Sequence, residues 1–130
     1  MTIRKLEHTG VMVNNLEESI DFYTRILGME LKGILQHNQP GMRLAFLSFP
    51  GQTVELELIE GYPVAVAPEG QVHHLAFTVD DIEVEAERLR ALGVSFIEPE
   101  ITTLRNQARY IFFAGPNGEQ LELFQPGTEA

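Results

Sequence analysis

The chain has 130 residues with 19 acidic and 9 basic side chains, so its formal net charge is −10. Hydrophobic residues make up 44% of the sequence and charged residues 22%, which is typical of an ordinary folded domain. The deficit of lysine and arginine argues against nucleic acid or an anionic membrane as a partner. Since cysteine is absent and no apolar run is long enough to span a bilayer, we expect one cytoplasmic domain without disulfides.

An internal repeat organises the sequence. The segment 8–16 (HTGVMVNNL) aligns with 74–82 (HLAFTVDDI) at an offset of 66 residues. Each segment is followed by a helical stretch that ends in Leu-Gly, where the offset is 65, so the second copy has one residue fewer. We therefore expect a first repeat at about 3–60, a turn-rich linker at 61–71 and a second repeat at about 72–125.

Each repeat is predicted to contain one strand, one helix and then three strands. Alternating and β-branched residues predict the first strand at 6–13 and its counterpart at 72–79. The other strands are expected at 30–35, 43–49, 54–59, 94–97, 109–114 and 120–124. Because a βαβββ unit leaves one sheet face open, we expect an α+β fold in which the two tandem βαβββ modules combine into one larger curved sheet.

The helix has the same start and stop signals in both repeats. Asn14 and Asp80 are the expected N-caps, with Glu17 and Glu83 three residues later in capping-box spacing. The glycine that ends each helix is expected to adopt the left-handed conformation that favours this residue.

Strand alternation places one histidine and one glutamate of each repeat on the same sheet face. His8 and His74 lie opposite the apolar face of the first strands, which is the face expected to pack on the helix. Glu57 and Glu122 likewise lie opposite the leucines of the last strands. Two imidazoles and two carboxylates suit one divalent transition metal, such as Ni, Co, Zn, Mn or Fe.

The remaining histidines are not expected to be ligands. In a regular strand His73 points to the face opposite His74, and His37 lies beside asparagine and proline in a predicted loop.

Four further polar residues are candidates for substrate binding. Arg43 and Arg109 occupy equivalent strand positions at an offset of 66, where they could hold an anionic group. Glu55 and Gln120 share the ligand face with the two glutamates and are candidate substrate or proton-relay contacts.

Three segments carry a resemblance to a known family: 8–16 with the Phe22-Tyr23 pair that follows, 72–82 (VHHLAFTVDDI) and 116–123 (PNGEQLEL). They resemble the vicinal oxygen chelate superfamily, which includes glyoxalase I, methylmalonyl-CoA epimerase, fosfomycin-resistance proteins, extradiol dioxygenases and bleomycin-binding proteins. The resemblance spans nearly the whole chain and implies two tandem βαβββ modules whose eight strands form one cup-like mixed sheet around a metal, often in a homodimer. By motif position, the metal ligands of glyoxalase I fall on His8, Glu57, His74 and Glu122.

This ligand set implies a metal-dependent lyase of the glyoxalase I type, similar to lactoylglutathione lyase. Such an enzyme transfers a proton on a metal-chelated hemithioacetal through an enediolate. By resemblance Glu122 is the principal base, and Glu57 is a ligand and second acid or base. Met12 and Gly61 stand where bacterial glyoxalase I typically has the arginine and asparagine that hold glutathione, so another thiol or another substrate fits better.

Two alternatives remain open at this point. The segments 42–49 (MRLAFLSF) and 72–77 resemble methylmalonyl-CoA epimerase, an isomerase that runs the same proton chemistry on an acyl-CoA. The superfamily also contains non-catalytic modules that sequester a drug or metabolite, although these often lack the metal residues. In each case the expected partner is a small molecule, such as a thiol adduct or an acyl-CoA.

Overall fold

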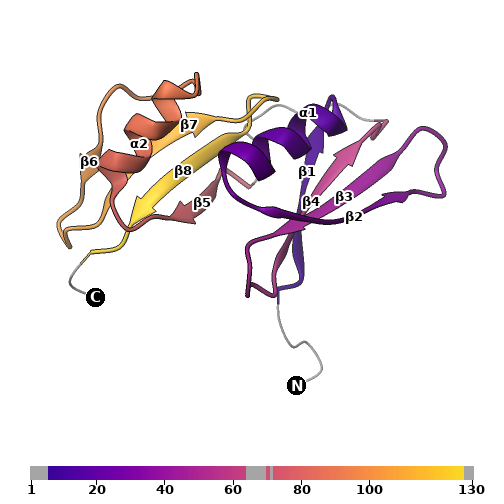
Figure 1. Ribbon diagram of the computed structural model, residues 1–130, viewed down its shortest axis with the longest axis horizontal. Helices are drawn as coiled ribbons and strands as arrows, with labels where there is room; N and C mark the ends of the chain where they lie inside the picture. Colours follow the sequence, from indigo (N-terminus) through magenta and orange to yellow (C-terminus); the bar gives the residue numbers. More distant parts are fainter. Residues whose placement is uncertain (1–5, 64–69, 71, 128–130) are drawn as a thin grey trace. The chain divides into compact units, whose positions relative to one another are not determined.

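The computed structural model describes residues 6–63, 70 and 72–127. The chain divides into two compact units, Met1–Ala65 and Val66–Ala130, each containing one four-stranded mixed sheet. Both sheets have the same strand order, β1-β4-β3-β2 in unit 1 and β5-β8-β7-β6 in unit 2 (Figure 1). The α+β class with two βαβββ modules is confirmed, whereas their union into one eight-stranded cup stays a prediction. Most of the expected linker lies outside the described residues.

The elements follow one another in the same way in both units. Unit 1 contains β1 (His8–Val13), α1 (Leu16–Asp21), the π-helical turn η1 (Phe22–Ile26), β2 (Glu30–Gln36), β3 (Arg43–Ser48) and β4 (Glu55–Glu60). Unit 2 contains β5 (Leu75–Thr78), α2 (Ile82–Ala91), β6 (Thr102–Thr103), β7 (Arg109–Ala114) and β8 (Gln120–Gln125). Among the described residues, no helix has the length and apolar character needed to cross a membrane.

In each unit the helix covers one face of the sheet and leaves the other face to the polar residues. Leu56 and Leu58 of β4 are buried in the core of unit 1. Glu57 lies between them, so the pleat directs it to the opposite face. The same alternation in β8 separates Glu122 from the buried leucines on either side of it. We call this second face, which carries Glu57 in unit 1 and Glu122 in unit 2, the ligand face.

The strand expected at 94–97 is instead an irregular edge. Phe96 makes a single bridge to Phe113 of β7, and the Glu98 carboxylate accepts the backbone amide of Phe112 at 2.9 Å. A side chain thus replaces the backbone acceptor that a regular strand would supply. Pro99 follows and has no N–H to donate, so regular pairing with β7 resumes only in the two-residue β6.

Both helices begin one residue later than the capping pattern predicts. The N-caps are Asn15 and Asp81, not Asn14 and Asp80. Their side chains accept the backbone amide three residues further on, at 3.0 Å and 3.2 Å. The sequence offers two adjacent capping residues at each site, and the later one brings a fully buried apolar residue to the first helical position.

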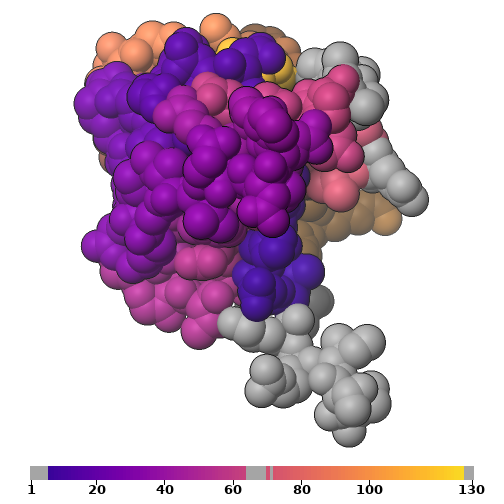
Figure 2. Space-filling model, turned by 90° about the vertical axis from the view of Figure 1, so that its right-hand side faces the viewer, coloured from indigo at the N-terminus to yellow at the C-terminus, as the bar shows by residue number. Residues whose placement is uncertain are grey.

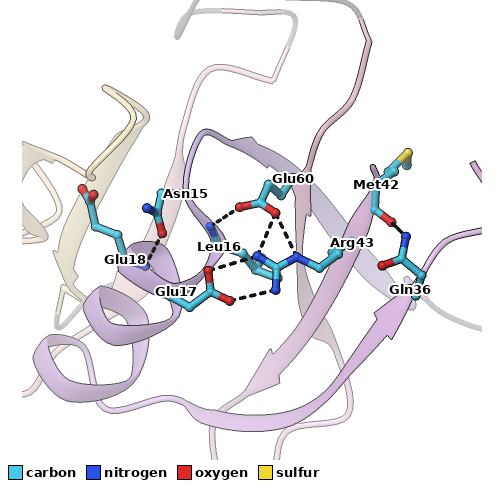
Figure 3. Close-up of polar contacts among 8 residues, drawn as sticks. All are labelled: Asn15, Leu16, Glu17, Glu18, Gln36, Met42, Arg43 and Glu60. Atoms are coloured by element: carbon cyan, nitrogen blue, oxygen red, sulfur yellow. Dashed lines mark hydrogen bonds and ion pairs between the residues drawn. The ribbon is translucent and has the colours of Figure 1, made fainter. Parts of the chain in front are cut away.

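A side chain from the end of the last strand holds the first amide of each helix. Glu60 Oε2 accepts the backbone amide of Leu16 at 2.8 Å (Figure 3), and Gln125 Oε1 accepts that of Ile82 at 2.9 Å. Because the first amides of a helix have no partner within it, these acceptors fix where each helix starts against its sheet.

An arginine of the third strand reinforces this contact. Arg43 Nε donates to Glu60 Oε1 at 2.9 Å, and its Nη atoms donate to the Glu17 carboxylate at 2.8 Å and 3.0 Å (Figure 3). In unit 2 the equivalent Arg109 Nη1 lies 3.6 Å from Glu83 Oε2. Both arginines therefore lie on the helix face of their sheets.

The extra residue of the first repeat is accommodated as a π-helical turn. The second helix is regular over Ile82–Ala91, whereas the first changes at Phe22 into η1, where the Leu27 amide donates to Phe22 O at 3.2 Å. A π-turn absorbs one additional residue, so the change of offset from 66 to 65 is located here. Gly28 and Gly93 end the two helices with φ of 88° and 84°, which confirms the expected left-handed conformation.

Strand β2 is the outer strand of the sheet in unit 1, and its side chains are almost all exposed. Figure 2 shows the violet surface of this part of the chain turned toward the viewer. Its pairing with β3 shifts register between Leu31 and Gly33, which marks a β-bulge.

Replacing Glu60 tests the helix anchor. We expect Glu60→Ala to lower the free energy of unfolding by about 1–2 kcal/mol, because the first amide of α1 loses its acceptor. Glu60→Gln keeps an acceptor oxygen, as Gln125 does in unit 2, and should cost less. Urea unfolding at neutral pH measures both, with Glu87→Gln on the exposed side of α2 as the control. Equal losses for the two Glu60 variants would mean that the helix amide does not need this acceptor.

Candidate functional site

Each unit holds one histidine and one glutamate side by side on its ligand face. His8 Nε2 lies 3.7 Å from Glu57 Oε1, and His74 Nε2 lies 3.5 Å from Glu122 Oε1. The glutamate side chains expose only 15% and 11% of their surface, while the histidines expose 40% and 35%. The structure therefore brings together, within each unit, the pair that strand alternation predicts.

Strand pairing explains how the pair in unit 1 forms. β1 and β4 are parallel neighbours in which His8 lies opposite Glu55 and Gly10 lies opposite Glu57. His8 shares a face with Gly10, so its ring reaches diagonally to the Glu57 carboxylate. A Cβ at Gly10 would lie 3.4 Å from Glu57 Oε1 and 3.1 Å from Ile59 Cδ1. A side chain here would therefore press on Ile59 and touch the carboxylate, and glycine avoids both contacts.

The environment of Glu122 raises the pKa of its carboxyl group. Burial is the largest cause and the negative charge of Glu98 adds to it, while His74 acts in the opposite direction. Glu98 is held nearby by its hydrogen bond to the amide of Phe112, which lies opposite Glu122 in the sheet. A carboxylate with a raised pKa accepts a proton more readily at neutral pH, which is what a general base requires.

Aromatic rings line the pair in unit 2. The Phe112 ring centroid lies 5.0 Å from that of His74 and 5.6 Å from that of Tyr110, both in edge-to-face arrangements. These residues share the ligand face because Phe112 is paired with Glu122 across the sheet. The rings restrict the position of the His74 imidazole and make this part of the ligand face apolar.

The structure contradicts the expectation that His73 points away from His74. The two Nδ1 atoms lie 2.8 Å apart, and His73 Nε2 lies 3.3 Å from Gln120 Nε2. Strand β5 starts only at Leu75, so both histidines precede the regular strand and their side chains do not alternate. Sequence alternation alone offers no signal for this contact.

His37 lies in the turn after β2, as predicted from the residues around it. Its Nδ1 accepts the backbone amide of Gln39 at 2.9 Å, so the ring stabilises the turn.

The two arginines lie on the face of their sheets that the helices cover. Arg43 and Arg109 contact glutamates of α1 and α2 there, which is the face opposite the histidine–glutamate pairs. Their equivalent positions in the repeat are confirmed, and a role toward an anionic substrate group stays a prediction.

Glu55 and Gln120 lie on the ligand face, as expected. Glu55 is half-buried and lies opposite His8 in the register of β1 and β4. The Gln120 carboxamide donates to the backbone oxygen of His73 at 3.2 Å. Their roles toward a substrate stay predictions.

The donor set of each pair is compatible with a divalent metal ion. A histidine nitrogen and a carboxylate oxygen 3.5–3.7 Å apart are close to the spacing of two ligands that each lie about 2.0–2.2 Å from one ion. Within residues 6–63, 70 and 72–127, no group of three or more potential ligands gathers in one place.

Comparison with known proteins identifies the family. The model of the Glyoxalase/Bleomycin resistance protein/Dioxygenase superfamily matches residues 5–123. The chain belongs to this superfamily. A Bacillus subtilis (strain 168) superfamily relative named uncharacterized protein YwbC is 44% identical over 94% of this chain and 98% of its own length. A probable lactoylglutathione lyase of Vibrio cholerae is 30% identical over 96% of this chain and 93% of its own length.

Other superfamily relatives have different names. An ethylmalonyl-CoA/methylmalonyl-CoA epimerase of Cereibacter sphaeroides is 29% identical over 95% of this chain and 98% of its own length. Among solved structures, the trypanothione-dependent glyoxalase I of Leishmania major matches with a TM-score of 0.76 at 26% identity, over 95% of this chain and 87% of that chain. Because lyases and epimerases both occur, membership of the superfamily does not by itself assign the reaction.

Replacing Glu122 tests its electrostatic environment. Because the folded state raises the pKa of this carboxyl group, its ionised form destabilises the folded protein at neutral pH. The cost is fully present above the folded pKa and disappears as the pH falls below the ordinary value of 4.5. We therefore expect Glu122→Gln to raise the Tm of the metal-free protein at neutral pH.

Calorimetry over a series of pH values measures this effect, with Glu87→Gln as a control for the change in net charge. The gain in Tm should shrink steadily and vanish at about pH 4. A Tm difference that is independent of pH would contradict the assigned environment.

Proposed function

We propose that this protein is a metal-dependent lyase of the glyoxalase I type, in which the two histidine–glutamate pairs jointly hold one divalent cation. The observation that carries this proposal is that both units present the same two donors, Nε2 and Oε1, at equivalent places on the ligand face. The donor set is the same whether one chain or two copies of it supply the two pairs. Ni, Co, Zn, Mn and Fe all accept such ligands.

Charge supports this assignment of the four residues. Glu57 and Glu122 are the least exposed members of the pairs, and buried carboxylates are costly unless they are compensated. Two carboxylates and two neutral imidazoles bring the total charge with a divalent ion close to zero. A bound cation would thus offset the cost that burial imposes on both glutamates.

Glu122 is the proposed base of the reaction. When bound, the ion would supply Lewis-acid polarisation of adjacent substrate oxygens. Glu122 would take the proton from the carbon that bears the hemithioacetal sulfur and return it to the neighbouring carbonyl carbon. This isomerisation yields a hydroxyacid thioester with no atom gained or lost. Glu57 is proposed as a ligand that can serve as second acid or base.

The substrate is proposed to be a hemithioacetal formed by a thiol other than glutathione. The relative named lactoylglutathione lyase supports the hemithioacetal class. Gly61 has φ of 83°, and a Cβ there would collide with the backbone oxygen of Gly41. No asparagine fits at this position without moving the backbone. Met12, which lies on the ligand face opposite Ile59, offers no charge to an anionic thiol.

A methylmalonyl-CoA epimerase-like reaction is the second candidate. The Cereibacter sphaeroides relative carries that name over nearly the full length of both chains. Removal of a proton next to a thioester carbonyl, followed by its return to the opposite face of the carbon, needs the same base and the same ion. The two candidates differ in substrate rather than in the residues that act.

Metal binding tests what both candidates share. We expect the purified protein to hold a stoichiometric divalent metal by elemental analysis. The chelator-treated protein should gain thermal stability when Ni, Co, Mn or Zn is added, because the ion binds only the folded state. Variants His74→Ala and Glu57→Gln should lose this gain, and His37→Ala should keep it. The absence of both metal and gain in the wild-type protein would contradict both enzyme assignments and favour a sequestering role.

Turnover separates the two candidates. Methylglyoxal is assayed with a panel of thiols beside methylmalonyl-CoA, using the metal-loaded protein. We expect lyase activity that Glu122→Gln lowers by about 10²–10⁴-fold in kcat, since a general base contributes that much. Turnover of the CoA ester alone would replace the lyase by the epimerase-like reaction.

A further inference from the structure

The residue that precedes each proposed ligand histidine contacts the Nδ1 atom of that histidine's ring. His73 Nδ1 lies 2.8 Å from His74 Nδ1, and Glu7 Oε1 lies 3.3 Å from His8 Nδ1. Glu7 and His73 are equivalent positions in the repeat, separated by the same 66 residues as the histidines they contact. In both units the other ring nitrogen, Nε2, faces the glutamate of the pair.

We propose that Glu7 and His73 are positioning residues that hold the rings of His8 and His74 with Nε2 directed at the ligand face. This inference rests on the proposed function, because it concerns how the proposed ligands are oriented. A histidine that serves as a ligand through Nε2 carries its proton on Nδ1, and that proton needs an acceptor. The contacts of Glu7 and His73 are with that Nδ1 atom.

In unit 1 the partner is a carboxylate, which only accepts hydrogen bonds when ionised. Glu7 therefore favours the form of His8 that has its proton on Nδ1 and a lone pair on Nε2. This contact is longer than the one between the two imidazoles in unit 2, 3.3 Å against 2.8 Å, so the effect of Glu7 should be smaller than that of His73.

In unit 2 the partner is a second imidazole, which can either donate or accept. Gln120 Nε2 lies 3.2 Å from the backbone oxygen of His73 and 3.3 Å from its Nε2, and it can donate to both. His73 then carries its proton on Nδ1 and donates it to His74 Nδ1. This leaves the His74 proton on Nε2, facing Glu122 at 3.5 Å.

The contact between the two Nδ1 atoms can also run in the reverse direction. When His74 Nε2 gives up its proton to act as a ligand, His74 Nδ1 becomes the donor and His73 Nδ1 accepts. The His74 ring does not need to move, since the same two atoms remain in contact. His73 then carries its proton on Nε2, so the Gln120 carboxamide turns to present its oxygen to that nitrogen. Phe112 supports this fixed geometry, with its ring centroid 5.0 Å from that of His74 and 6.0 Å from that of His73.

Variants of His73 separate this role from simple packing. His73→Phe keeps an aromatic ring beside Phe112 but removes both ring nitrogens, whereas His73→Asn keeps a group that donates and accepts. His37→Phe is the matched control, because it removes a histidine from a turn outside the pairs. We expect calorimetric titration with Co or Zn to show about 10-fold weaker binding for His73→Phe, and little change for the other two.

A second readout needs no metal. In the metal-free protein, long-range ¹H–¹⁵N correlation of the imidazoles reports which nitrogen of His74 carries the proton. The wild-type protein should show it on Nε2, and His73→Phe should give a mixture of both forms. In unit 1, Glu7→Ala should shift His8 away from the Nδ1-protonated form, while Glu7→Gln, which keeps an acceptor oxygen, should shift it less.

The possible outcomes distinguish the two proposals. If the wild-type protein binds no metal, the proposed function fails, and the proton position on His74 still decides the role of His73. The positioning role is overturned if His73→Phe leaves both the metal affinity and the His74 proton position unchanged. It is equally overturned if His73→Asn is as damaging as His73→Phe, because packing would then be the cause.

Discussion

One hydrogen bond in each unit determines which face of the sheet is free for chemistry. The side chain of Glu60 or Gln125, at the end of the last strand, accepts the first amide of the helix and ties that helix to one face. Glu57 and Glu122 lie three residues earlier on the same strands, and an odd separation directs them to the opposite face. A single strand therefore supplies both the anchor of the helix and the carboxylate of the ligand face, and the position of one implies the position of the other.

The repeat duplicates the donors but not their surroundings. Glu122 is buried beside a second carboxylate and a row of aromatic rings, and its pKa is raised. Glu57 lies opposite Gly10 and beside His8, whose Nδ1 contacts the exposed carboxylate of Glu7. Two chemically identical groups in different environments can take different roles, and here Glu122 is proposed as the principal base in addition to its role as a ligand. The proposed reaction needs this difference, because one glutamate acts as the principal base and the other as a ligand and second acid or base.

Strand alternation and the internal repeat were sufficient to predict the fold class and the two histidine–glutamate pairs. Both depend on local periodicity, which the pleat converts directly into a shared face. The start of each helix was missed by one residue because two capping residues are adjacent and tertiary contacts choose between them. The orientation of His73 and the ion pairs of Arg43 could not be predicted. The first depends on where β5 begins, and the second on glutamates that are distant in sequence.

The outer strand of unit 1 has a consequence for solubility during folding and storage. An exposed strand edge with leucine and isoleucine side chains invites another chain to pair with it and begin aggregation. In β2 the register shift between Leu31 and Gly33 interrupts the flat ladder that such pairing needs. Lys32 lies at this interruption, ion-paired with Glu30 at 3.1 Å, and any incoming strand would have to desolvate that charge. The register shift and the charge of Lys32 thus both oppose pairing of another strand with β2.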